Sequence, residues 1–252
     1  MTIEEIKKKL AGSEYDFLRT NEHLGENIIL LGLGGSYAYG NAIDEISDLD
    51  IRGCALNTKE QVLLGTDFGS VNKQAMDVKI HSFKRLIHLL TGNNPSIIEL
   101  IGLKKEHYLY LHPIGQEIID NKDMFIYKKV ISAFHGCIHD TINNMNKQED
   151  LLKKAKGMSH IIRLYNMLFD LVETGEIITY RESDHELLMD LRNGKYLLEN
   201  GIPNKAYYDM LSERESLLKR CQNDNNLPDE PDYKAIQKFV MSVNERVVRG
   251  EV

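Results

Sequence analysis

The segment from Leu30 to Gly53, LLGLGGSYAYGNAIDEISDLDIRG, constrains the fold more than any other part of the chain. It places four glycines within nine residues and follows them, eight residues later, with Asp-Leu-Asp. The apolar run that ends in these glycines indicates a buried strand entering a tight turn. Acidic and apolar residues alternate over 47–56, which predicts a second strand. Since residues i and i+2 of a strand project to one face, Asp48 and Asp50 are expected side by side.

Two common phosphate-binding motifs do not fit the glycines. A dinucleotide fingerprint that starts at Gly32 meets Tyr37 where its last glycine belongs. A P-loop needs Lys and then Ser or Thr after its second glycine, but Asn and Ala follow Gly40. On the glycines alone, a strand-to-helix turn without any ligand stays open.

The acidic pair favours a ligand. Two adjacent carboxylates repel each other, and a divalent cation such as Mg²⁺, which prefers carboxylate and phosphate oxygens, removes that conflict. The backbone N–H groups of the glycine turn and Ser36, at the start of a helix, can bind a phosphate chain. Together these features are typical of phosphoryl or nucleotidyl transfer.

The motif GGSYAYG followed by SDLD resembles the signature of the DNA polymerase β-like nucleotidyltransferase superfamily. The resemblance implies a third carboxylate on a later strand, and Asp77 in MDVKIH takes that position. It implies that Asp48, Asp50 and Asp77 are catalytic and hold Mg²⁺ or Mn²⁺. It also implies that Gly35 and Ser36 contact the β- and γ-phosphates of a nucleoside triphosphate, with ATP expected. A hydroxyl would attack the α-phosphorus and release pyrophosphate, which is an EC 2.7.7-type reaction.

A closer resemblance covers most of the chain. The segments GGSYAYG, SDLDIRG, NNPSIIELI, FIYKK, KAKGMSHIIRLYNML and LRNGKY are similar to those of predicted bacterial and phage nucleotidyltransferases of the YcgL type. The later segments indicate family relationship rather than catalytic roles.

The remaining patterns predict an α+β chain. Apolar spacing favours an amphipathic helix over 2–20, and alternation favours a strand over 76–83. Helices are expected over FKRLIHLLTG and NPSIIELIG, and helical patterns dominate after Ile126, with breaks at Gly157, Gly175, Gly194 and Gly201. A last helix is predicted from Tyr233 to about Val248. We therefore expect a catalytic domain over 1–122 with a small mixed sheet, and a helical domain over 123–252.

Three cationic residues follow one another at helical spacing in the second half. Lys156, His160 and Arg163 share one face at i, i+4 and i+7. They would bind the triphosphate or an anionic acceptor, with His160 and Arg163 favoured over Lys156, or they would form a solvated helix face. Under the first interpretation, Arg163→Ala weakens ligand binding more than it changes stability.

Other candidates have both a functional and a structural interpretation. Glu99 could act as a general base, with Asn94 facing the acceptor pocket, or Asn94 could cap a helix that begins at Pro95. His81 would border the site or be a buried, hydrogen-bonded histidine. His135 and His139, at i and i+4, would bind zinc only if further ligands converge. Asp44 and Glu45 are interpreted as solvated acids.

Composition bounds the partners. A net charge of −7 disfavours broad binding to a phosphate backbone, and no apolar run is long enough to span a bilayer. Three separated cysteines and an N-terminus without a signal-peptide layout favour the cytoplasm. The expected acceptor is a small hydroxylated molecule or a protein hydroxyl, with an RNA end as an alternative. A protein that senses nucleotides without turnover is the competing class, and a homo-oligomer stays open.

Overall fold

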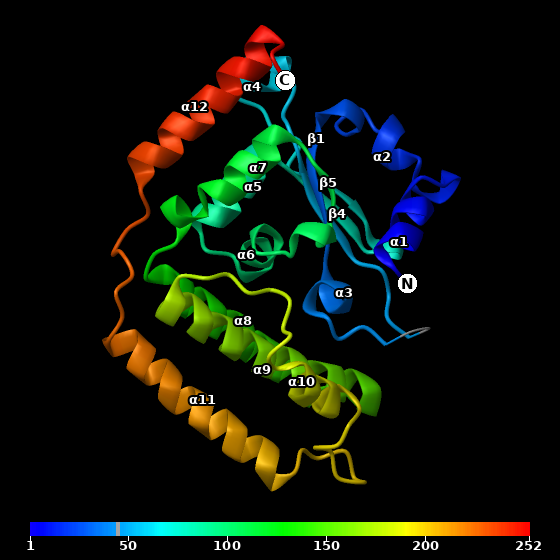
Figure 1. Cartoon of the computed structure of the whole chain (residues 1–252), viewed down its shortest axis with the longest axis vertical. Helices are drawn as coiled ribbons and strands as arrows, with labels where there is room; N and C mark the ends of the chain where they lie inside the picture. The colour runs from blue at the N-terminus through cyan, green and yellow to red at the C-terminus, as the bar shows by residue number, and fades with distance from the viewer. Residues whose placement is uncertain (44–45) are drawn as a thin grey trace.

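The computed structural model describes residues 1–43 and 46–252. Its described part combines a mixed β-sheet with helices that cover the sheet and extend away from it (Figure 1). The strands lie in the order β3-β4-β2-β1-β5. Their bounds are β1 Ile28–Leu33, β2 Ile51–Ala55, β3 Ser70–Lys73, β4 Val78–Ser82 and β5 Tyr108–Leu111. The α+β expectation is confirmed.

The register of the sheet fixes which loops meet. β1 pairs antiparallel with β2, and β2 pairs parallel with β4, so that Ile51 lies opposite Val78. β3 and β5 add antiparallel edges to β4 and β1. Because β2 and β4 run in the same direction, the segments that lead into them reach the same end of the sheet.

The first strand and its turn form as the sequence predicts. All six residues of β1 are buried, because an apolar run lies in the centre of a covered sheet. The strand leads through Gly34 into α3 (Gly35–Tyr39), a short helix that ends at Gly40 in the left-handed conformation. Gly40 therefore closes a tight strand-helix-loop unit.

The helices that precede the second half are short. They are α1 Ile3–Leu10, α2 Phe17–Thr20, α4 Lys59–Leu64, α5 Phe83–Thr91, α6 Pro95–Ile101 and α7 Pro113–Asp120. The prediction of one helix over 2–20 is wrong. The backbone at Gly12 is extended, and a 3₁₀ turn, Ser13–Tyr15, follows before α2. The predictions over α5 and α6 are confirmed.

Helices dominate the second half, as expected, and all of them except α10 are longer than those of the first half. They are α8 Lys129–Asn146, α9 Leu151–Thr174, α10 His185–Arg192, α11 Lys205–Asn223 and α12 Tyr233–Arg249. Gly175 ends α9 in the left-handed conformation, but the predicted break at Gly157 is wrong. Gly157 lies inside α9, where an added Cβ would come within 3.1 Å of the Met145 side chain on α8. Its small size thus permits close packing of the two helices.

The hydrophobic core is continuous between the two halves of the chain. One buried cluster extends from Ile29 in β1 to Val247 in α12. Figure 1 shows α12 returning to the sheet half, where the rings of Phe83 and Phe239 pack 6.0 Å apart. Arg246 of α12 also forms a bidentate ion pair with Glu117 of α7, with both contacts at 2.8 Å. The division at residue 122 stays a prediction. No helix among the described residues has the length and apolar character needed to cross a membrane.

Candidate active site

Two of the predicted carboxylates lie at the same end of the sheet. Asp50 directly precedes β2 and Asp77 directly precedes β4, in neighbouring parallel strands, and the N–H of Ile51 donates to the carbonyl oxygen of Asp77 at 3.0 Å. Asp77 has a positive φ of 51°. The expectation that Asp48 and Asp50 project from a strand is wrong, because β2 begins only at Ile51. The strand entrances, rather than one strand face, position these acids.

Arg52 links the two carboxylates. Its Nη2 lies 2.8 Å from Oδ1 of Asp50 and 3.9 Å from Oδ1 of Asp77, and its Nη1 donates to the backbone oxygen of Asp77 at 2.6 Å. Burial raises the pKa of Asp50, and the charge of Asp77 adds to this, while Arg52 and Lys156 act in the opposite direction. The raised pKa means that Arg52 does not fully offset the cost of burying the ionised Asp50 carboxylate.

Asp48 does not join this pair. It is exposed, and its side chain makes no hydrogen bond or ion pair with the residues that the structure describes. The carboxylate oxygens of Asp48, Asp50 and Asp77 are not all within 4.8 Å of one another. The structure therefore brings together two of the three predicted acids and leaves the third on the loop that leads to them.

The glycine turn lies against Asp50. The N–H of Gly34 donates to the backbone oxygen of Asp50 at 2.8 Å, and a Cβ added to Gly35 would overlap the Asp50 carboxylate at Oδ2. Gly35 has a φ of +56°, which disfavours other residues independently of space. Ser36 is buried within α3 and does not line the neighbouring cleft. Glycine at position 35 thus lets the backbone approach the acid.

We expect Gly35→Ala to impair the site more than its backbone strain explains. A left-handed non-glycine residue costs about 1–2 kcal/mol, and the overlap with Asp50 would displace the carboxylate as well. Gly65→Ala is the matched control, because Gly65 has a φ of +70° and no atom within 4 Å of an added Cβ. Both variants should lose unfolding free energy in urea, with the larger loss in Gly35→Ala because of the overlap, but only Gly35→Ala should lose activity. Equal activity in the two would contradict the role of Gly35.

A cleft of about 370 Å³ opens beside the turn. One wall includes Gly34, Gly35, Asp50, Arg52 and Glu99, and the other comes from the helical half. The helical residues are Thr141, Asn144, Met145, Gln148, Lys153, Lys156, Gly157, His160 and Arg192. Asp50 and the glycine turn therefore face a wall of amides and cations across a cavity of the size that holds a small ligand, whereas Asp77 is not among the residues that line it.

The three cationic residues of α9 have different positions. Lys156 is exposed at the cleft and its charge acts on Asp50. His160 also lines the cleft, half-buried, whereas the side chain of Arg163 is fully buried. Arg163 therefore does not line the cleft, whereas Lys156 and His160 do.

Arg163 belongs to a buried polar network with Glu99 of α6. Its Nη2 donates to Oε1 of Glu99 at 2.6 Å, and its guanidinium carbon lies 3.5 Å above the ring of Tyr39. The Tyr39 hydroxyl donates to Oε2 of Glu99 at 2.9 Å, so both carboxylate oxygens have protein partners. These contacts favour the structural interpretation of Glu99 over the general base.

His160 is held in one tautomer by the same arginine. Nη2 of Arg163 lies 3.0 Å from Nδ1 of His160, and because arginine only donates, Nδ1 must accept and Nε2 must carry the hydrogen. Burial, and then the charges of Arg163 and Lys156, lower the pKa of His160 to about 3. His160 is therefore a neutral side chain with a single N–H donor at the cleft.

Arg192 of α10 is a cleft residue that the sequence interpretation missed. It is 7% exposed, and its Nη2 donates to Oγ of Ser47 at 3.0 Å. Its Nε is buried without a hydrogen-bond partner, and it forms no ion pair with the described residues. Burial alone lowers the pKa of Arg192. Its position four residues after the buried Leu188 is the signal that could have placed it on the inner face of its helix.

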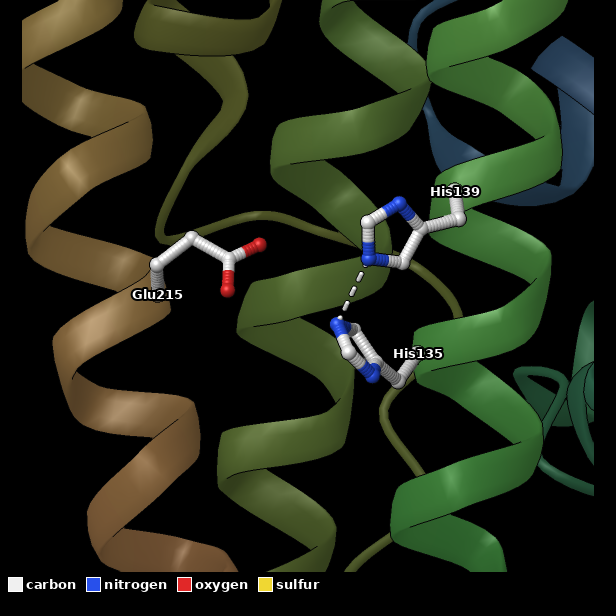
Figure 2. Close-up of side chains that lie close together, drawn as sticks. All are labelled: His135, His139 and Glu215. Carbon is white, nitrogen blue, oxygen red and sulfur yellow. Dashed lines mark hydrogen bonds between the residues drawn. The ribbon is translucent and has the colours of Figure 1, made fainter.

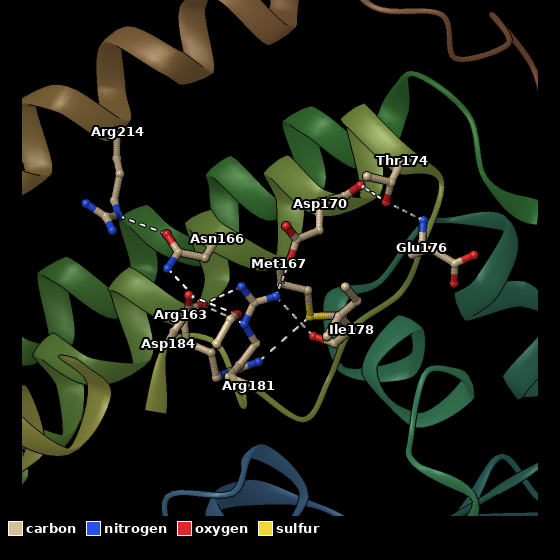
Figure 3. Close-up of polar contacts among 11 residues, drawn as sticks. Arg163, Asn166, Met167, Asp170, Thr174, Glu176, Ile178, Arg181, Asp184 and Arg214 are labelled. Carbon is tan, nitrogen blue, oxygen red and sulfur yellow. Dashed lines mark hydrogen bonds and ion pairs between the residues drawn. The ribbon is translucent and has the colours of Figure 1, made fainter. Parts of the chain in front are cut away.

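The other buried arginines of the helical half show what is unusual about Arg192. Arg181 is 3% exposed and pairs with Asp170 and Asp184, and its Nε donates to Oδ2 of Asp184 at 2.8 Å (Figure 3). Arg163 pairs with Glu99. A buried charge without a counter-charge is costly. Arg192, at the cleft, therefore has the electrostatics of an anion-binding residue.

The remaining candidates have structural roles or lie elsewhere. Asn94 is at the N-terminal boundary of α6, but its side chain makes no capping hydrogen bond. His81 is buried, its Nδ1 lies 3.1 Å from Oγ of Ser70 on β3, and burial lowers its pKa to about 4. The interpretation of His81 as a hydrogen-bonded core histidine is thus confirmed. Asp44 and Glu45 lie outside the described residues.

The family comparison agrees with this geometry. A family model, RlaP, described as an RNA repair pathway DNA polymerase beta family, matches residues 4–247. The chain belongs to this family. RlaP membership confirms the polymerase β-like nucleotidyltransferase superfamily and transferase activity at that level. The closer likeness to the YcgL type stays a prediction. A search of curated proteins gave no match.

Proposed function

We propose that the cleft binds a nucleoside triphosphate, with ATP as the first candidate, and transfers its nucleoside monophosphate to a hydroxyl acceptor. The observation that carries this proposal is the pair of carboxylates, Asp50 and Asp77, beside the Gly34–Gly35 turn in a chain of the RlaP family. We propose further that 1–122 supplies the chemistry and that 123–252 supplies the opposite wall of the cleft.

The acidic pair fits a divalent metal ion such as Mg²⁺ or Mn²⁺. Burial raises the pKa of Asp50, and its Oδ2 has no hydrogen bond with the described residues. Asp50 and Asp77 would hold the ion, and Asp48 would be the third carboxylate of the set. Such an ion neutralises phosphate charge and makes an attacking hydroxyl more acidic. Arg52 occupies one oxygen of Asp50 and keeps the two acids together.

In the proposed step, the oxygen of the acceptor hydroxyl forms a bond to the α-phosphorus. The bond from that phosphorus to its bridging oxygen breaks, and pyrophosphate leaves with the electron pair. Asp77 receives the hydroxyl proton, since its side chain is 53% exposed and is the more accessible of the two carboxylates. The N–H group of Gly35 and the cations Lys156 and Arg192 bind the phosphates, while His160 donates through Nε2. Ser36, expected at the phosphates, is buried and does not line the cleft.

We expect Arg192→Met to weaken nucleotide binding without weakening the fold. A hydrogen bond to a charged group contributes about 1.5–3 kcal/mol, so the KM for the triphosphate should rise ~10- to 100-fold. Since the buried guanidinium has no counter-charge among residues 1–43 and 46–252, its removal should leave the melting temperature unchanged or higher. Arg181→Met is the contrasting variant. It leaves the carboxylates of Asp170 and Asp184 without their ion-pair partner, so it should lower the melting temperature. If Arg192→Met lowers the melting temperature and leaves the KM for the triphosphate unchanged, Arg192 has a structural role and does not bind the nucleotide.

We propose RNA as the first acceptor to be tested. The RlaP family is described as an RNA repair pathway family, and an RNA 3′ end offers the hydroxyl that the proposed step needs. A small hydroxylated molecule or a protein hydroxyl is the acceptor that the acidic net charge favours. The three classes differ in where the transferred nucleotide is found.

The test uses the full chain with α-³²P-labelled triphosphates and Mg²⁺, and measures pyrophosphate release and the location of the label. Oligoribonucleotides with 3′-hydroxyl ends, cell-extract small molecules and cell-extract protein are the acceptor arms. Label on one of them, together with equimolar pyrophosphate, supports the proposal and identifies the acceptor. Magnesium-dependent triphosphate binding without pyrophosphate in any arm would instead support a nucleotide sensor.

A further inference from the structure

We propose that His135, His139 and Glu215 form a second metal site, for a transition-metal ion such as Zn²⁺, which links α8 to α11. The site is separate from the carboxylates of the cleft, and it does not depend on the proposed function. Figure 2 shows the three side chains pointing into one space from two helices that are far apart in the sequence.

The geometry is close to that of a bound ion. His135 and His139 lie one turn apart on α8, and their Nε2 atoms are 2.9 Å apart. A carboxylate oxygen of Glu215 lies with both nitrogens in a group whose members are all within 4.8 Å of one another. Ligands bonded to zinc at about 2.0–2.1 Å are separated by ~3.3 Å in a tetrahedron. A small movement of the Glu215 side chain would therefore complete three ligands.

The charges around the site favour a cation. Glu215 accepts a hydrogen bond from the hydroxyl of the buried Tyr165 and forms no ion pair with the residues that the structure describes. Its carboxylate faces two imidazoles, one of which must be unprotonated at Nε2 to accept the hydrogen bond between the rings. The Tyr165 hydroxyl also orients the carboxylate, as outer partners do for metal ligands.

The ligand types specify the class of metal. Two imidazole nitrogens and one carboxylate suit Zn²⁺, Co²⁺ or Ni²⁺, whereas Mg²⁺ prefers oxygen ligands throughout. His139 is exposed, so a fourth position is open to water. The aspartates at the sheet are an all-oxygen set, and the two sites should therefore select different ions.

The position of the site gives the metal a structural role. α11 extends over nineteen residues but buries only Tyr207, Leu218 and Cys221. Glu215 lies between the first two of these, on the stretch that passes α8 and α9. A metal bond there would fasten α11 to α8, and metal binding to the folded state alone stabilises that state.

The test is a Co²⁺ titration of the untagged, chelator-treated full chain, followed by its visible absorption. We expect one equivalent with the spectrum of a low-coordinate site, displacement by Zn²⁺ but not by excess Mg²⁺, and a higher melting temperature with Zn²⁺. Loss of an outer-shell partner alone weakens metal binding about 10- to 100-fold, so His135→Gln, His139→Gln and Glu215→Gln should each weaken it by at least ~100-fold.

Two control variants make the outcome decisive. His185→Gln removes an exposed histidine that lies outside this group and should leave Co²⁺ binding unchanged. Asp50→Asn should also leave it unchanged, which separates this site from the cleft. The proposal is overturned if the wild-type chain shows no Co²⁺ band, if His135→Gln retains wild-type affinity, or if His185→Gln loses as much as the three ligand variants.

Discussion

Asp50→Asn is expected to lower nucleotidyl transfer by at least ~1,000-fold, well beyond the 10- to 100-fold effect of losing an outer-shell partner. Asp50 lines the cleft, contacts the glycine turn and is linked to Asp77 through Arg52. Asparagine keeps the shape and one oxygen but removes the charge on which a divalent ion depends. Pyrophosphate release under saturating triphosphate and Mg²⁺ measures the loss.

The same substitution should not harm the fold. Burial raises the pKa of Asp50 above its unfolded value, so the ionised carboxylate at neutral pH costs stability in the folded state. That cost is present above the folded pKa and disappears as the pH falls through it. Without metal, Asp50→Asn should therefore melt at the wild-type temperature or higher. Asp209→Asn, on an exposed residue of α11, is the control that should retain activity. An active Asp50→Asn would refute the proposed chemistry.

Local signals in the sequence predicted the elements around the site. The apolar run that ends in glycines became β1 and its turn, and Pro95 marked the first residue of α6. The last helix begins at Tyr233 as expected and ends at Arg249. These features depend on residues within one or two turns of each other, so a short window of sequence contains their cause.

The partners of the charged residues could not be predicted in this way. Glu99 is sixty-four residues from Arg163, and nothing near Arg163 indicates that a carboxylate will meet it in the core. The resemblance groups Asp50 with Asp77, but the parallel pairing of β2 with β4 that brings them together is not visible in the local sequence. The sequence therefore leaves Arg163 between a phosphate ligand and a solvated helix face, and it does not indicate Arg192, whose charge has no partner among the residues that the structure describes.

Arg163→Met is expected to destabilise the protein by about 3–5 kcal/mol, the usual cost of removing one partner of a buried ion pair. Burial opposes the charge of Arg163, but Glu99 and Tyr39 outweigh it and raise its pKa. Without the guanidinium, Glu99 keeps only the Tyr39 hydroxyl as a partner, and Nδ1 of His160 loses its donor. Urea unfolding measures the loss.

The double variant Glu99→Gln/Arg163→Met distinguishes a structural pair from a phosphate ligand. If the cost of Arg163→Met comes from stranding the Glu99 carboxylate, neutralising that carboxylate should recover part of it, so that the double variant is more stable than Arg163→Met alone. A phosphate ligand predicts the reverse pattern, in which Arg163→Met keeps wild-type stability, raises the KM for the triphosphate and shows no coupling to Glu99. Because the Arg163 side chain has no exposed surface and its Nη2 lies 2.6 Å from Glu99, we expect coupling in stability, with any effect on KM following from the lost orientation of His160.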